Sequence, residues 1–200
     1  MHHFFPETKH SVAKQTIRKR VSDTQVIKYV DEIIDSFGDV GLGLGSQISQ
    51  LIELSVLDDL DHFIKEQLHI KYYIRNMDDF VLIHNDKEYL KYCLKEISKI
   101  LSNIGLSLNN KTMIQRLSYG ITFLKWKFIL KENGKVYMCL PKKWLSKKKR
   151  KISRVLEKEK QGYVLIGTSQ KCLNGIIAYA SQGNTYVKRN KLLKWYREKK

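Results

Sequence analysis

The 200-residue chain is predicted to adopt an α+β fold, in which a core of helices and antiparallel strands precedes a basic, all-helical segment. Apolar residues recur at helical spacing in several stretches, which predicts amphipathic helices. Between them lie short aromatic and β-branched runs bounded by turn residues, as expected for strands of hairpins. The charge is also uneven, because residues 1–130 hold 17 basic and 16 acidic residues whereas residues 131–200 hold 20 and 4. We therefore expect two segments, 1–140 and 141–200.

The individual elements follow from periodicity and turn residues. In the first segment, a helical period predicts helices over residues 10–21, 23–37, 46–68 and 86–104. Short β-prone runs predict strands over residues 72–74, 80–83, 106–108, 113–117, 121–130 and 135–140, the last two joined by an Asn133-Gly134 turn. Glycine density marks residues 38–45 as a loop. After Pro141, helices alone are expected, over residues 142–160, 170–180 and 184–199.

Composition excludes several classes of protein. With 42% hydrophobic residues the chain can bury a sizeable core. No apolar run approaches the roughly 20 residues of a membrane helix, and the first residues lack the apolar stretch of a signal peptide. Cys93, Cys139 and Cys172 are odd in number and widely spaced, which fits a reducing compartment and argues against a zinc site. We therefore expect a cytoplasmic protein with no membrane partner.

The basic C-terminal segment points to a polyanionic partner. Residues 142–151 read KKWLSKKKRK, and Tyr179, Tyr186, Trp195 and Tyr196 are interleaved with the later lysines and arginines. A sharp asymmetry of charge combined with aromatic residues favours nucleic acid. An anionic membrane surface is the second interpretation, and a basic helix that is merely solvated is the third.

The most informative local feature is the Asp78-Asp79 pair within YYIRNMDDFVLIH. The flanking runs predict a hairpin that holds both carboxylates at its tip. Neighbouring carboxylates repel each other, so a rigid turn that presents two of them favours a bound cation. The Asp58-Asp59 pair lies instead in a stretch of helical period, where it indicates only the solvated side of a helix. A solvated turn is the alternative for Asp78 and Asp79 as well.

Five short motifs extend this observation along the chain. In order they are Phe4-Phe5, LGSQISQ at 44–50, NMDDF at 76–80, LSLNNKT at 106–112 and GITFLKWKF at 120–128. Over essentially the whole chain, their order resembles the palm and thumb of bacterial reverse transcriptases of the group II intron and diversity-generating retroelement type. The resemblance implies a polymerase palm over residues 1–140, an antiparallel sheet with helices on one face, and an all-helical basic thumb over residues 141–200. It implies RNA-directed DNA polymerase activity.

The resemblance assigns the catalytic roles to the predicted hairpin. Asp78 would be a ligand of two Mg²⁺ ions with Asp79 beside it, and ions roughly 3.5–4 Å apart activate the primer 3′ oxygen and stabilise the departing pyrophosphate. Asn76 stands where the family usually has tyrosine. Lys111 resembles a lysine that protonates or neutralises the pyrophosphate. A solvated turn lysine is the alternative for Lys111.

Further residues resemble the nucleotide and template site, namely Phe5, Gly45, Ser49 and Gln50. Phe5 would exclude a ribose 2′-hydroxyl, Gly45 would let the backbone approach a nucleotide, and Ser49 and Gln50 would offer hydrogen bonds. Leu44 and Gln50 depart from the usual QGxxxSP pattern toward the form found in diversity-generating enzymes, where base selection is relaxed. A glycine loop followed by a helix capped at Ser46 is the alternative for this stretch, and a core position is the alternative for Phe5.

The remaining motifs resemble surfaces that hold the primer and template. Phe123, Leu124 and Trp126 resemble the primer-grip hairpin, although Lys125 stands where glycine is usual, and an ordinary β-hairpin is the alternative. The thumb residues expected to bind nucleic acid are Lys142, Lys143, Lys147, Lys148, Lys149, Arg150 and Lys151. The implied partners are an RNA template, a DNA primer and a deoxynucleoside triphosphate, with magnesium as the cofactor.

The motif spacing also implies a missing part. In the family the first catalytic aspartate lies four residues before the first phenylalanine, and the fingers lie before that aspartate. Counted back from Phe4, the position of the aspartate falls just before Met1. We therefore expect the chain to resemble the C-terminal part of a reverse transcriptase that is inactive alone, with an N-terminal fragment or an accessory retroelement protein as a further partner. The alternative is a catalytically inactive remnant that binds RNA or RNA–DNA hybrids. A palm-like nucleotide cyclase is disfavoured, because that class does not need a basic thumb.

Overall fold

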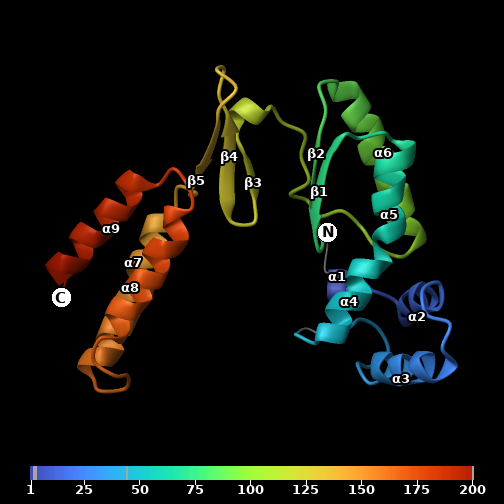
Figure 1. The fold of residues 1–200 in the computed structure, drawn as a ribbon, viewed down its shortest axis with the longest axis horizontal. Coiled ribbons are helices and arrows are strands. Elements are labelled where there is room, and N and C mark those ends of the chain that lie inside the picture. Colours follow the sequence, from blue (N-terminus) through green and yellow to red (C-terminus); the bar gives the residue numbers. More distant parts are fainter. Residues whose placement is uncertain (2–3, 44, 200) are drawn as a thin grey trace. The chain divides into compact units, whose positions relative to one another are not determined.

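The computed structural model describes Met1 and residues 4–43 and 45–199, and it divides into two compact units, Met1–Ile114 and Gln115–Lys200 (Figure 1). Each unit combines helices with an antiparallel sheet and has a hydrophobic core of its own, which confirms the predicted α+β class. The units divide before residue 115, whereas the sequence suggested a boundary after residue 140. The difference arises because the strands after residue 120 share a core with the C-terminal helices.

The first unit contains most of the predicted helices. The structure forms α2 (His10–Arg18), α3 (Thr24–Asp35) and α6 (Lys87–Asn103) within the predicted ranges. It forms α4 (Gln47–Val56), α5 (Asp58–His62) and the π-helix η1 (Phe63–Gln67) within residues 46–68, and α1 (Phe4–Glu7), which was not predicted. Asp23 caps α3 by accepting hydrogen bonds from Gln25 N (2.8 Å) and Val26 N (3.1 Å), and Asp86 caps α6 in the same way. The single helix expected over residues 46–68 is instead interrupted at Leu57, whose backbone (φ −95°, ψ 5°) leaves the helical region.

The predicted carboxylate hairpin is confirmed. Strands β1 (Tyr72–Asn76) and β2 (Asp79–Ile83) pair antiparallel with Asn76 opposite Asp79, which leaves Met77 and Asp78 as a two-residue turn. One face of the hairpin packs on the helical core through Tyr73, Phe80 and Leu82, while Tyr72 and Ile74 on the other face are more than half exposed. Helices α5 and α6 run alongside the hairpin in Figure 1.

The second unit begins with a short 3₁₀-helix, η2 (Leu117–Tyr119), and continues into a three-stranded sheet. Its strands are β3 (Ile121–Phe123), β4 (Trp126–Leu130) and β5 (Val136–Cys139), in the order β3-β4-β5. Its long helices are α7 (Trp144–Lys160), α8 (Thr168–Ser181) and α9 (Tyr186–Lys199). The run expected as one strand over residues 121–130 therefore turns at Leu124-Lys125 and forms two. Strands expected over residues 106–108 and 113–117 do not form, and loop and 3₁₀ backbone occupy these positions.

The core of the second unit ties its sheet to its helices. Trp126 and Leu140 from the sheet region are buried together with Trp144, Leu173 and Tyr196 from the three helices. Among the described residues, none of the helices is both long and apolar enough to span a bilayer.

Candidate active site and nucleic-acid interface

The tip of the β1–β2 hairpin holds Asp78 in a fixed position. The first turn residue, Met77, has a positive φ of 54° whereas Asp78 does not, as in a type II′ turn, whose first position prefers glycine. A larger residue in this region is strained, and such strain persists only where the surrounding structure fixes the backbone. Asp78 follows it with a side chain that is 39% exposed, and Asp79 begins β2 opposite Asn76 with an exposed side chain.

The amino group of Met1 lies directly against this tip. It donates a hydrogen bond to the backbone oxygen of Asp78 at 3.2 Å, and it lies 3.6 Å from Asp78 Oδ2. Figure 1 shows the N-terminus beside the end of the hairpin. The side chain of Met1 is buried, so this contact belongs to the packed core of the unit. Any residue joined to the Met1 nitrogen would therefore lie next to the Asp78 carboxylate.

The turn that carries Lys111 is connected to the same place. Asn109 Nδ2 donates to Met1 O at 3.3 Å, and Asn109 Oδ1 accepts from Lys111 N at 2.9 Å. The Lys111 side chain is exposed and forms no ion pair within the described part of the chain. The structure thus brings the Asp78 tip, Met1 and the Lys111 turn together, although they are far apart in sequence.

Behind the tip lies a buried carboxyl group that the sequence did not reveal. Glu53, on α4, is fully buried, and its Oε2 accepts a hydrogen bond from Thr8 Oγ1 at 3.2 Å. Burial raises the pKa of Glu53 to about 8; the Thr8 hydrogen bond opposes this shift and the charge of Asp78 adds to it. Glu53 Oε1 and Ser49 Oγ are buried without a hydrogen-bond partner among the described residues. The available signal was the spacing, since Glu53 lies four residues after Ser49 and three before Val56, all on the buried side of α4.

Phe5 connects α1 to the glycine loop. Its ring is half-buried and lies edge-on to the buried Phe4 ring, with centroids 5.8 Å apart. Its carbonyl oxygen accepts a hydrogen bond from Leu42 N at 2.9 Å. Gly41, which directly precedes Leu42, has a φ of +89°, and a Cβ on this residue would lie 2.8 Å from the carbonyl oxygen of Pro6. The close approach requires glycine at this position.

The other residues that resemble a nucleotide site divide between surface and interior. Gly45 (φ +90°) and Gln50 are exposed, so both are accessible to a ligand. Ser49 is fully buried, which directs its hydroxyl into the core beside Glu53 rather than to the surface. Ser46 Oγ accepts from Ser49 N at 3.4 Å, which is the helix cap considered as the alternative for this stretch. Leu44 lies outside the described residues.

The residues that resemble a primer grip form a tight hairpin in the second unit. Its turn residues, Leu124 (φ 48°) and Lys125 (φ 71°), are both left-handed, as in a type I′ turn. Phe123 is half-buried and pairs with Trp126 across the turn, and Leu124 is exposed at the tip. Trp126 is almost completely buried, and its ring packs on the Tyr179 ring of α8, with ring centroids 5.1 Å apart. Trp126 therefore anchors the hairpin to the helices, and Leu124 is the motif residue at the surface.

The basic residues predicted to bind nucleic acid lie on and just before α7. Lys142, Lys143, Lys147, Arg150 and Lys151 are exposed, whereas Lys148 and Lys149 are half-buried. The Lys149 ammonium lies 5.3 Å from the centre of the Trp195 ring, so part of this charge is held against an aromatic face.

One side of α7 gathers four cations around a small surface pocket. Lys147, Arg150, Lys151 and Arg154 line this pocket of about 180 Å³ at the i, i+3, i+4 and i+7 positions of the helix. Arg154 was not part of the predicted set, and its spacing from Lys147 and Lys151 was the signal for it. The second unit as a whole contains 23 basic and 4 acidic residues. Such a surface attracts polyanions strongly.

Asp78 and Asp79 at the hairpin tip offer carboxylate oxygens, the donor type that magnesium prefers. Within residues 4–43 and 45–199 and Met1, no group of three or more His, Cys, Asp or Glu side chains is arranged to hold a metal ion. Mg²⁺ is commonly held by one or two carboxylates together with substrate phosphates and water. Asp78 and Asp79 could supply those carboxylates. No protein-family model matches the chain, and no curated protein matches it.

Proposed function

We propose that the chain is the palm-and-thumb part of an RNA-directed DNA polymerase of the reverse transcriptase type, which extends a primer 3′-hydroxyl along an RNA template. The observation that carries this proposal is the contact between the Met1 nitrogen and Asp78. The motif spacing puts the first catalytic aspartate of the family directly before Met1. A carboxylate in that place, from a longer chain or from a paired polypeptide, would lie beside Asp78 and Asp79 and complete a three-carboxylate site.

In this proposal the residues of the first unit hold and neutralise the reacting groups. When bound, magnesium would activate the primer oxygen and stabilise charge on the pyrophosphate. Asp78 and Asp79 would bind it, and the strained turn at Met77 would keep the two carboxylates in place. Lys111, tied to the tip through Asn109 and Met1, would neutralise the departing pyrophosphate.

The second unit would grip the RNA–DNA hybrid. Its basic surface is supported by a separate core, so it can present the α7 cations as a rigid row. Every lysine or arginine that contacts a phosphate releases counterions, so hybrid affinity should fall steeply with salt.

A primer-extension assay tests the proposal. The purified chain alone should show no Mg²⁺-dependent, RNA-templated extension, and a separately produced polypeptide with fingers and the first catalytic strand should restore it. Asp78→Asn should abolish the restored activity, because it removes a metal ligand. Asp58→Asn is the matched control, since Asp58 belongs to the helical Asp-Asp pair and binds Arg20 at 2.6 Å. Extension by the chain alone, or restored extension that survives Asp78→Asn, would refute the proposal.

A second candidate is a binding protein without catalysis. The observation that favours it is that the second unit has its own core and most of the positive charge, independent of Asp78. Hybrid affinity would then be unchanged by Asp78→Asn and strongly reduced by combined Lys147→Gln, Arg150→Gln and Lys151→Gln. This result, together with failure of every complementation attempt, would favour the binding protein over the polymerase.

A further inference from the structure

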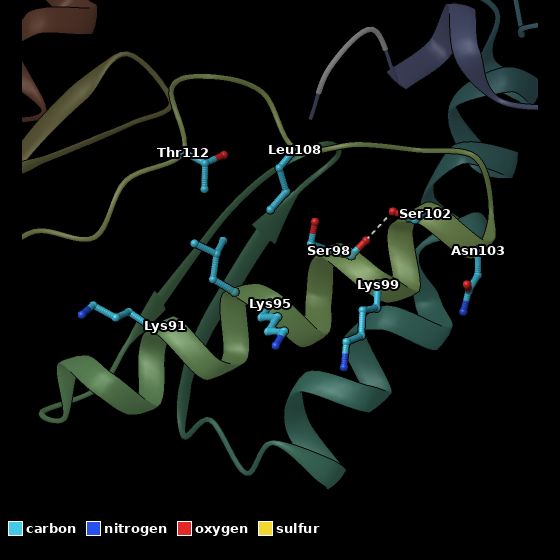
Figure 2. A pocket seen from close by; sticks show the side chains of 9 residues that line it. Lys91, Lys95, Ser98, Lys99, Ser102, Asn103, Leu108 and Thr112 are labelled. Atoms are coloured by element: carbon cyan, nitrogen blue, oxygen red, sulfur yellow. Dashed lines mark hydrogen bonds between the residues drawn. The ribbon is translucent and has the colours of Figure 1, made fainter.

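A groove in the first unit lies far along the chain from the basic thumb and has no role in the proposed polymerase. It has a volume of about 680 Å³ and runs along the exposed side of α6, with Leu108 and Thr112 contributed by the segment that follows the helix (Figure 2). Lys91, Lys95 and Lys99 line it at successive i+4 positions. We refer to it as the α6 groove.

The positive charge of the α6 groove is local. The first unit as a whole is slightly acidic, with 14 basic and 16 acidic residues in positions 1–114. Lys91 pairs with Glu88 at 2.8 Å and Lys99 with Glu96 at 2.7 Å. Both are exposed pairs within one helix, which contribute little and can be exchanged for a ligand phosphate. Lys95, between them, has no carboxylate partner in the described part of the chain.

The groove also offers uncharged donors and an apolar floor. The Ser98 and Thr112 hydroxyls line it and make no side-chain hydrogen bond with the described residues, so both can donate to a phosphate oxygen. Leu94 and Leu108 contribute apolar surface. Tyr92, three residues before Lys95 and hence on the same side of the helix, is half exposed and could stack on a base.

The spacing of the cations selects the ligand. Consecutive lysines at i+4 are separated by about 6 Å along the helix, so the row spans about 12 Å. A strand within a B-form duplex carries a phosphate about every 3.4 Å of axis, and a single strand is more extended, so more than one phosphate would fall within this row. A single phosphate would use only one of the lysines. A basic groove beside an exposed aromatic ring is the combination that binds single strands.

We propose that the α6 groove binds the phosphate backbone of single-stranded nucleic acid, with Lys91, Lys95 and Lys99 contacting the phosphates. This site belongs to the first unit, and it does not depend on polymerase activity. A chain without catalysis would still bind a strand here.

The test uses the full chain and a 12-nucleotide oligo(U) RNA. Lysine acetylation, read by mass spectrometry, should show Lys91, Lys95 and Lys99 protected by saturating RNA, while Lys28 on α3 is modified at an unchanged rate. Lys28 is a suitable reference because it is also an exposed helical lysine of the first unit without a carboxylate partner among the described residues. Equal modification of Lys95 with and without RNA would overturn the proposal, even if the RNA is bound elsewhere on the chain.

Charge reversal provides an independent measurement. One phosphate contact on a single strand is worth about fivefold in affinity between 1 M and 0.1 M salt. Lys95→Glu should therefore bind the RNA at least about fivefold more weakly than Lys28→Glu at 0.1 M salt, and the difference should disappear near 1 M. Because both side chains are exposed, both variants should fold, which circular dichroism checks. Equal affinities of the two variants at 0.1 M salt would overturn the proposal.

Discussion

Glu53→Gln tests the physical account of the first unit most sharply. Glu53 is fully buried, with Thr8 as its hydrogen-bond donor and with Oε1 unpartnered among the described residues. A glutamine of the same shape can keep the hydrogen bond from Thr8 Oγ1. The substitution therefore removes a titratable proton without creating a cavity.

The expected magnitude follows from the pKa of Glu53, which burial raises from its ordinary value of 4.5 to about 8. Because the folded-state pKa is raised, the unfolded chain loses its proton first, and stability falls as the pH rises from 4.5 through 8. Each pKa unit corresponds to about 1.36 kcal/mol. Relative to acidic pH, Glu53 therefore lowers the free energy of unfolding by about 3 kcal/mol at pH 7 and by about 5 kcal/mol well above pH 8. Glu53→Gln should remove this cost, which makes the variant several kcal/mol more stable at pH 8.5 and nearly equal at pH 4.5.

Pulsed thiol labelling during urea unfolding can measure this. Cys93 is buried in the core of the first unit, whereas Cys139 and Cys172 lie in the second unit and serve as an internal reference. Only the Cys93 transition should shift in the variant. Glu32→Gln, at an exposed position of α3, is the control and should follow the unchanged protein at every pH. If the Cys93 transition of Glu53→Gln loses stability with pH as steeply as that of the unchanged protein, the reasoning about Glu53 is wrong.

Two further substitutions test the hairpins. Lys125→Gly should stabilise the second unit by about 1 kcal/mol, because glycine tolerates the left-handed backbone of this turn at no steric cost. All three tryptophans lie in that unit, so urea unfolding followed by tryptophan fluorescence reports it, and a loss of stability would contradict the turn assignment. Asp61→Asn should destabilise the first unit by about 3 kcal/mol, because Asp61 accepts from Tyr73 Oη at 2.6 Å and pairs with Arg75, whose side chain is only 9% exposed. Asp59→Asn, which removes an exposed pair with Lys19, should cost under about 0.5 kcal/mol by the same Cys93 labelling, and equal effects of the two variants would refute the distinction.

Local signals predicted most of the secondary structure. Helices were expected to begin near residues 23 and 86, where Asp23 and Asp86 cap α3 and α6, and Gly105 follows α6 with a φ of +77°. The Leu124-Lys125 turn was missed because neither residue is one that prefers left-handed backbone, so the run read as a continuous strand. Helical periodicity also did not reveal the break of the long helix at Leu57.

The candidate site was predicted in its parts but not in its assembly. The Asp78-Asp79 hairpin is formed as expected, and the Lys111 turn is tied to it through Met1, a connection over about a hundred residues that no local pattern contains. Ser49 and Trp126 were assigned ligand contacts by resemblance, yet both are buried. Which side of a helix or strand faces the core depends on its partners, and a single sequence does not specify them.

The measurement that tests the central claim most directly concerns the position before Met1. The chain would be extended at its N-terminus by a strand-forming segment that ends in aspartate directly before Met1, and by a matched segment that ends in asparagine. Primer extension on an RNA template would then be assayed with both, in the presence of the complementing fingers polypeptide. The account predicts Mg²⁺-dependent extension with aspartate and at least a hundredfold less with asparagine, since roughly 3 kcal/mol of transition-state stabilisation would be lost. Equal extension by the two, or none with either, would contradict the claim that Asp78 lies in a polymerase active site.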